Sequence, residues 1–130
     1  MYNKYVFKSD LPIYRNYILD NKIPEKYPLK EKDHGLYDTP DCYTKWASIL
    51  MMFDQIKTDK MKVVDLGTGE GPLPHVISDQ GHDVTGVDNM RVDHPFGSSL
   101  VVMILKDAIE FFKDIEDESV DVFTDSCNSL

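Results

Sequence analysis

A glycine-rich turn between an apolar run and a helical pattern constrains the fold of this chain more than any other feature. Residues 62–66 (KVVDL) form a short apolar run rich in β-branched residues, which is typical of a buried strand. The turn at 67–71 (GTGEG) follows at once, and a helix is expected over 72–80, stopped by Gly81. Glycine permits positive φ and close approach of a ligand, and the N–H groups of the next helix point at the turn. The turn therefore predicts a ligand-binding loop that suits an anionic group.

The alternation of strands and helices continues after this turn. Further strands are expected at 83–88, 100–105 and 120–124, with a loop between 88 and 100 and a helix over 107–115. In that helix, Ile109, Phe112 and Ile115 are expected to face inward. Alternation of this kind requires parallel strands joined by right-handed crossovers, so the sequence predicts an α/β fold.

The region before the first strand has a different character. Residues 1–38 form a polar, tyrosine-rich arm, in which a short helix is expected over 11–20. Pro24 and Pro28 are expected to keep the chain after it extended or turning. Residues 39–130 are assigned to one domain, which opens with a helix over 40–57 that carries an apolar stripe.

Composition limits the classes of function. The net charge of −9 argues against a nucleic-acid partner, because duplex binding places Lys and Arg against phosphates. No apolar stretch of membrane-spanning length and no signal peptide are evident, so a cytoplasmic location and no membrane partner are expected. The two cysteines and four histidines are scattered, and no metal site is expected.

The spacing of the glycines separates two classes of cofactor. A dinucleotide fingerprint needs a third glycine where this chain has Pro72, which disfavours a nicotinamide-dependent dehydrogenase. The pattern Asp65-x-Gly67-x-Gly69-x-Gly71 instead resembles the first motif of the class I S-adenosylmethionine-dependent methyltransferases. The stretch from Val63 to Asp88 resembles that family without a gap, and the resemblance as a whole spans about residues 62–130.

The resemblance implies a Rossmann-like three-layer α/β/α fold with parallel strand order 3-2-1-4, and S-adenosyl-L-methionine as the cofactor. Asp88 would bind the ribose hydroxyls, and Asp107 with Ala108 would surround the adenine. Asp125 lies where family members line the methyl-donor pocket. The full set of cofactor-binding residues implied in this way is Asp65, Gly67, Thr68, Gly69, Gly71, Asp88, Asn89, Asp107, Ala108 and Asp125.

The resemblance also suggests what this chain lacks. The family fold has seven strands, whereas about four are expected here, so the chain is interpreted as a truncated, cofactor-binding half. Its methyl acceptor is expected to be a small molecule or a sugar, and the alternative is an inactive cofactor- or nucleotide-binding module. No catalytic base is assigned, since a structural or solvated role is favoured over catalysis for Asp125, Asn128 and His94. An unpaired outer strand would favour a homodimer through the edge at Val120–Leu130.

Overall fold

The computed structural model describes residues 11–28, 46–56, 59–68, 72–90 and 100–125. The chain divides into two compact units, residues 1–56 and residues 57–130, and each is described by itself. The domain boundary expected between residues 38 and 39 lies outside the described residues. Within the described ranges, no helix has the length and apolar character needed to cross a membrane.

The first unit contains three described helices: α1 (Leu11–Asp20), α2 (Ile23–Lys26) and α4 (Ser48–Gln55). Helix α1 has the bounds expected from the sequence. The expectation for Pro24 was wrong, because Pro24 lies in the first turn of α2, where its missing N–H is no loss. The hydroxyl of Tyr17 on α1 donates to Asp54 on α4 at 2.7 Å. Of the helix expected over 40–57, residues 40–45 lie outside the described residues.

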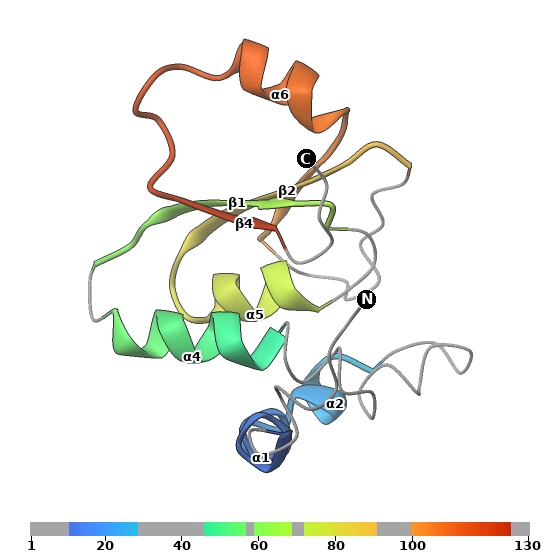
Figure 1. The fold of residues 1–130 in the computed structure, drawn as a ribbon, viewed down its shortest axis with the longest axis vertical. Coiled ribbons are helices and arrows are strands. Elements are labelled where there is room, and N and C mark those ends of the chain that lie inside the picture. Colours follow the sequence, from blue (N-terminus) through green and yellow to red (C-terminus); the bar gives the residue numbers. More distant parts are fainter. Residues whose placement is uncertain (1–10, 29–45, 57–58, 69–71, 91–99, 126–130) are drawn as a thin grey trace. The chain divides into compact units, whose positions relative to one another are not determined.

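The second unit is built on a sheet of four parallel strands (Figure 1). The strands are β1 (Lys62–Leu66), β2 (Asp83–Asp88), β3 (Val102–Leu105) and β4 (Val122–Asp125), in the order β3-β2-β1-β4. Four consecutive residues of β1, Val63 to Leu66, are buried, as expected for a central parallel strand covered on both faces. The predicted Rossmann-like α/β class and strand order are confirmed.

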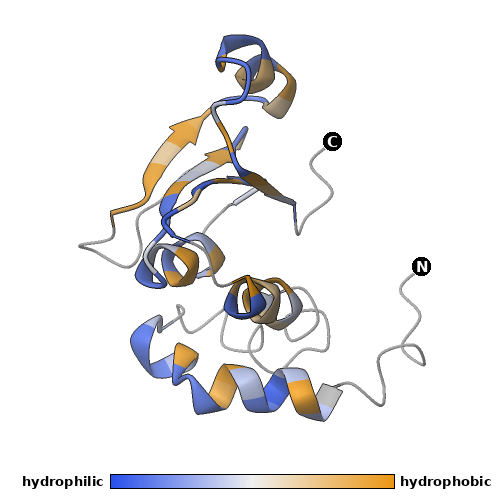
Figure 2. Ribbon diagram, turned by 90° about the vertical axis from the view of Figure 1, so that its left-hand side faces the viewer, coloured by the Kyte–Doolittle hydropathy of each residue, from blue (hydrophilic) through white to orange (hydrophobic). Residues whose placement is uncertain are grey.

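Two helices cover opposite faces of this sheet (Figure 1). Helix α5 (Leu73–Asp79) connects β1 to β2 and packs on β2, and helix α6 (Ala108–Asp114) connects β3 to β4. The core on the α6 side consists of Val64, Leu66, Val87, Ala108 and Phe111. Figure 2 shows hydrophobic residues along the strands and a mixture of hydrophilic and hydrophobic residues on α6. This amphipathic character is what a helix between a sheet and solvent requires.

The inward face of α6 differs from the expected one. Ile109 was expected to face the core, but 55 % of its surface is exposed, whereas Ala108 and Phe111 are buried. Phe112 and Ile115 pack against the core as expected. The stripe facing the sheet runs through 108, 111, 112 and 115 at helical spacing, and Ile109 lies one position off it.

Candidate functional site

The turn after β1 is attached to the end of the neighbouring strand. Gly67 has a φ of 66°, a left-handed conformation that glycine adopts without strain. The N–H groups of Gly67 and Thr68 both donate to the carbonyl oxygen of Val87 on β2, at 2.7 and 3.1 Å. Two residues of the expected loop are therefore fixed at the carboxyl ends of β1 and β2.

Thr68 also packs against the interior of β2. A Cβ atom placed on Gly86 would lie 2.8 Å from Cγ2 and 3.0 Å from Oγ1 of Thr68. Thr68 is buried, and Gly86 is buried in the middle of its strand. The side chain of Thr68 thus occupies the space that any larger residue at 86 would need.

Asp65 is a buried acid directly before this turn. Only 1 % of its surface is exposed, and Oδ1 accepts a hydrogen bond of 2.7 Å from the hydroxyl of Thr124 on β4. Burial raises the pKa of Asp65 to about 6, the hydroxyls of Thr124 and Thr68 oppose the rise, and the charges of Asp125 and Asp88 add to it. The Thr68 hydroxyl lies outside standard hydrogen-bonding geometry, so the Thr124 contact is the hydrogen bond that holds this carboxyl.

Asp88 ends β2 beside the same turn. Its side chain is half-buried, and Oδ1 accepts the N–H of Met90 at 2.8 Å, which orients the carboxylate at the strand end. The N–H of Lys106 donates to the carbonyl oxygen of Asp88 at 2.9 Å, so the loop after β3 is joined to the same point. The neighbouring Asn89 is exposed.

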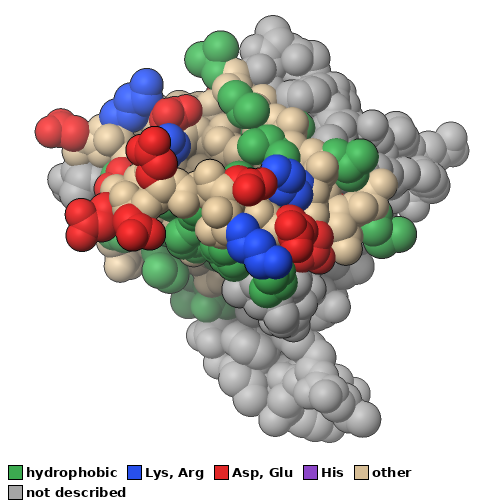
Figure 3. Space-filling model, turned by 90° about the horizontal axis from the view of Figure 1, so that it is seen from above, with side chains coloured by type: hydrophobic (Ala, Val, Ile, Leu, Met, Phe, Trp, Pro, Cys, Tyr) green, Lys and Arg blue, Asp and Glu red, His purple; other side chains and the backbone are tan. Residues whose placement is uncertain are grey.

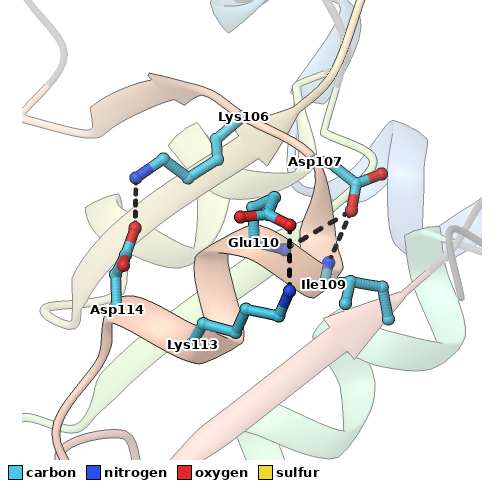
Figure 4. Close-up of polar contacts among 6 residues, drawn as sticks. All are labelled: Lys106, Asp107, Ile109, Glu110, Lys113 and Asp114. Atoms are coloured by element: carbon cyan, nitrogen blue, oxygen red, sulfur yellow. Dashed lines mark hydrogen bonds and ion pairs between the residues drawn. The ribbon is translucent and has the colours of Figure 1, made fainter.

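Asp107 has a structural role that the structure displays directly. It is the N-cap of α6, and its Oδ1 accepts the N–H groups of Ile109 at 2.9 Å and Glu110 at 3.4 Å (Figure 4). The exposed ion pairs Lys106–Asp114 and Lys113–Glu110 flank the cap in the same view. Ala108, the next residue, is buried against the sheet.

The parallel topology brings most of the expected residues to one edge of the sheet. Carboxyl ends of parallel strands share an edge, so Asp65, Gly67 and Thr68 of the first strand and turn lie on the same edge as Asp88 and Asn89. Asp125 at the end of β4 pairs with Leu66 in register, and Asp107 and Ala108 follow β3. The expected residues Gly69, Gly71, His94 and Asn128 lie outside the described residues.

Two residues of this edge were not identified from the sequence. Thr124 holds the Asp65 carboxyl, and Gly86 provides the space for Thr68. A signal for Gly86 was present, because a glycine inside a strand pattern often marks the close approach of another group. No such local signal marks Thr124, since its partner is set by the pairing of β4 with β1.

The described part of the chain holds no group of three or more His, Cys, Asp or Glu side chains arranged to bind a metal. Comparisons with protein-family models, with curated proteins and with solved structures found no match to this chain. A function must therefore be inferred from the chemistry of the residues at the carboxyl edge of the sheet. They offer a left-handed turn at Gly67, fixed at the ends of β1 and β2, and carboxylates that accept hydrogen bonds.

Proposed function

We propose that this chain carries the S-adenosyl-L-methionine site of a methyltransferase that acts on a small molecule. The observation that carries the proposal is the pairing of the left-handed turn at Gly67 with the oriented carboxylate of Asp88 on the adjacent strand. Ligands of open parallel sheets bind at this edge, and a carboxylate there accepts hydrogen bonds from both ribose hydroxyls.

The charge of the edge favours this cofactor over a dinucleotide. Asp88 and Asp125 end the two strands on either side of β1, and both raise the pKa of Asp65 through their charges. A pyrophosphate would meet acids of its own sign there, whereas a sulfonium with an ammonium group brings positive charge. When bound, the cofactor supplies the methyl group and the driving force for its transfer. The residues of this chain would bind and orient it.

A small methyl acceptor is the better fit to the surface of the chain. The net charge is −9, and in the face shown in Figure 3 the described Lys and Arg side chains lie among more numerous Asp and Glu side chains and do not gather into a patch. A phosphate backbone would gain little from such a surface. We place the enzyme in the cytoplasm as part of the same proposal.

Calorimetric titration with S-adenosylhomocysteine tests the proposal, with NAD as the competing ligand. Asp88→Ala should weaken S-adenosylhomocysteine binding by about a hundredfold or more, because two charge-assisted hydrogen bonds worth roughly 1.5–3 kcal/mol each are lost. Asp83→Ala is the matched control, since Asp83 is an exposed acid at the opposite end of the same strand. The Asp83→Ala variant should bind S-adenosylhomocysteine with the same affinity as the parent.

Three results would contradict the proposal. Equal affinity in Asp88→Ala and the parent would remove Asp88 from the site. Tighter binding of NAD than of S-adenosylhomocysteine would favour a dehydrogenase. Binding of S-adenosylhomocysteine without methyl transfer to any small acceptor would favour a cofactor-binding module over an enzyme.

A further inference from the structure

Gly86 is tightly packed near the carboxyl end of β2. It is buried on β2, and a Cβ atom added to it would lie 2.8 Å from Sδ of Met103, 2.8 Å from Cγ2 of Thr68 and 3.0 Å from Oγ1 of Thr68. Contacts of a Cβ atom shorter than 3.0 Å are essentially never seen in folded proteins, so a methyl group at 86 forces at least one neighbour to move. Any residue but glycine would displace part of this contact.

The two neighbours differ in how easily they can yield. The sulfur of Met103 is at the far end of a flexible side chain and can move by rotation about its side-chain bonds. The methyl and hydroxyl of Thr68 are attached to Cβ, one bond from the backbone, and β-branched side chains are stiff at χ1. A methyl at 86 therefore acts mainly on Thr68 and, through it, on the backbone of the turn.

The backbone of Thr68 is part of the candidate ligand loop. Its N–H and that of Gly67 share the carbonyl oxygen of Val87, the residue that follows Gly86. Those two hydrogen bonds and the contact of Thr68 with Gly86 hold the turn from two sides. If the side chain of Thr68 is lifted from β2, both N–H groups move away from their acceptor.

We infer that Thr68 is a positioning residue, and that its side chain, seated against Gly86, fixes the start of the ligand loop at the carboxyl ends of β1 and β2. Gly86 makes this placement possible because it has no side chain to fill the space that Thr68 occupies. The inference rests on the proposed function only where the loop meets its ligand, since the placement of the loop can be measured without one.

Amide hydrogen exchange in the ligand-free protein tests the placement. The quantity to measure is the ratio of the exchange rate of the Gly67 and Thr68 amides in a variant to the rate of the same amides in the parent, while the amides of Val63 to Asp65 in β1 report the stability of the whole unit. Gly86→Ala should raise this ratio about tenfold, as expected when a tight contact is overpacked and a turn opens locally. Thr68→Ser in the same chain moves one methyl from position 68 to position 86 and should return the ratio to within about threefold of the parent, since volume-conserving exchanges are tolerated best.

Two controls separate this mechanism from general loss of stability. Met103→Ala combined with Gly86→Ala should leave the ratio as high as in Gly86→Ala alone, because the flexible side chain of Met103 can move away from the added methyl group without being shortened. Gly81→Ala places a side chain at a φ of +100° with no atom within 4 Å, just before β2 begins and so at the opposite end of that strand from the turn. It should destabilise the whole unit and speed exchange of the β1 amides, but leave the ratio for the turn amides near one, since opening of the turn alone does not relieve strain at position 81.

An unchanged ratio in Gly86→Ala, or rescue by Met103→Ala and not by Thr68→Ser, would overturn the inference. If Gly86→Ala does not fold, recovery of folding by Thr68→Ser and not by Met103→Ala supports it. In the ligand arm, the affinity for S-adenosylhomocysteine should fall about tenfold in Gly86→Ala, return with Thr68→Ser and stay at the parent value in Gly81→Ala. A parent protein that binds no S-adenosylhomocysteine refutes the proposed function, while the exchange ratios still decide the role of Thr68.

Discussion

Asp65 should make the stability of the second unit depend on pH in a way that Asp65→Asn removes. Burial raises the pKa of Asp65 from 3.8 to about 6, so between these values the folded protein binds a proton that the unfolded chain has lost. The free energy of unfolding therefore falls as pH rises through this window and is constant above it with respect to this group. A rise of about two units corresponds to about 3 kcal/mol, since each unit is worth 1.36 kcal/mol.

Urea unfolding of the parent and of Asp65→Asn between pH 3.5 and pH 8 measures the effect. The useful quantity is the difference in free energy of unfolding between the two proteins, because every other titrating group cancels in it. Asparagine has the same shape and can still accept from Thr124, so the difference should shift in favour of the variant by up to about 3 kcal/mol as pH rises from 3.5 to 7. A difference that stays flat would refute the claim that the buried carboxyl titrates in this window.

Thr124→Val checks the same account from the partner. It removes the hydroxyl that donates to Asp65 at 2.7 Å. A hydrogen bond to a charged group is worth roughly 1.5–3 kcal/mol and a neutral one roughly 0.5–1.5 kcal/mol, so Thr124→Val should be more destabilising at pH 8 than at pH 3.5. In the Asp65→Asn background its cost should be independent of pH, and a cost that still varies would place the titration elsewhere.

The packing of the second unit can be tested at three other points. Phe111→Ala should lower the free energy of unfolding by about 3–4 kcal/mol, because Phe111 is in the core. Ile109→Ala, at a half-exposed position, should change it by less than about 0.5 kcal/mol. Similar costs for the two variants would contradict the inward face of α6. Asp107→Ala should cost about 1 kcal/mol by loss of the N-cap and Asp107→Asn much less, and an equal loss in both would show that the cap is not what matters. We expect a homodimer through the edge at Val120–Leu130, where Phe123 of the outer strand β4 is 43 % exposed. Sedimentation at micromolar concentration should show a dimer that Phe123→Lys weakens. A parent protein that sediments as a monomer would contradict this expectation.

Local patterns in the sequence predicted the bounds of a strand or helix well where those bounds depend only on the residues of the element and its immediate neighbours. β1 and β2 have the expected bounds, because each is a β-branched run followed directly by a turn residue. β4 was expected at 120–124 and is observed at Val122–Asp125. Its bounds depend on pairing with β1, in which Val122 lies opposite Val63, and Val120 instead packs against the α6 core. Such a shift depends on a partner distant in sequence and leaves no local trace.

The same limit applies to the candidate site: residues marked by local features could be predicted, and contacts between distant segments could not. The turn at Gly67 and the acid at Asp88 are visible because a glycine cluster and a strand-end carboxylate are local features. The hydrogen bond between Asp65 and Thr124 and the contact between Thr68 and Gly86 are not, because each joins residues on different strands or loops. Asp65 illustrates the difference, since an acid inside an apolar run is unfavourable locally and is held in the fold by a hydroxyl from another strand.

The sign of one free-energy change separates the two meanings that Gly86 can have. A glycine inside a strand costs about 0.5–1 kcal/mol relative to alanine, because the unfolded chain loses more freedom on folding. If Gly86 is merely tolerated in β2, Gly86→Ala should stabilise the protein by about that amount. If the space above it belongs to Thr68, the same substitution should destabilise by roughly 1–3 kcal/mol, the usual cost of overpacking a tight contact. The distances to Cγ2 and Oγ1 of Thr68 favour the second result, because both atoms lie too close to a methyl group for the gain in chain entropy to offset the contact.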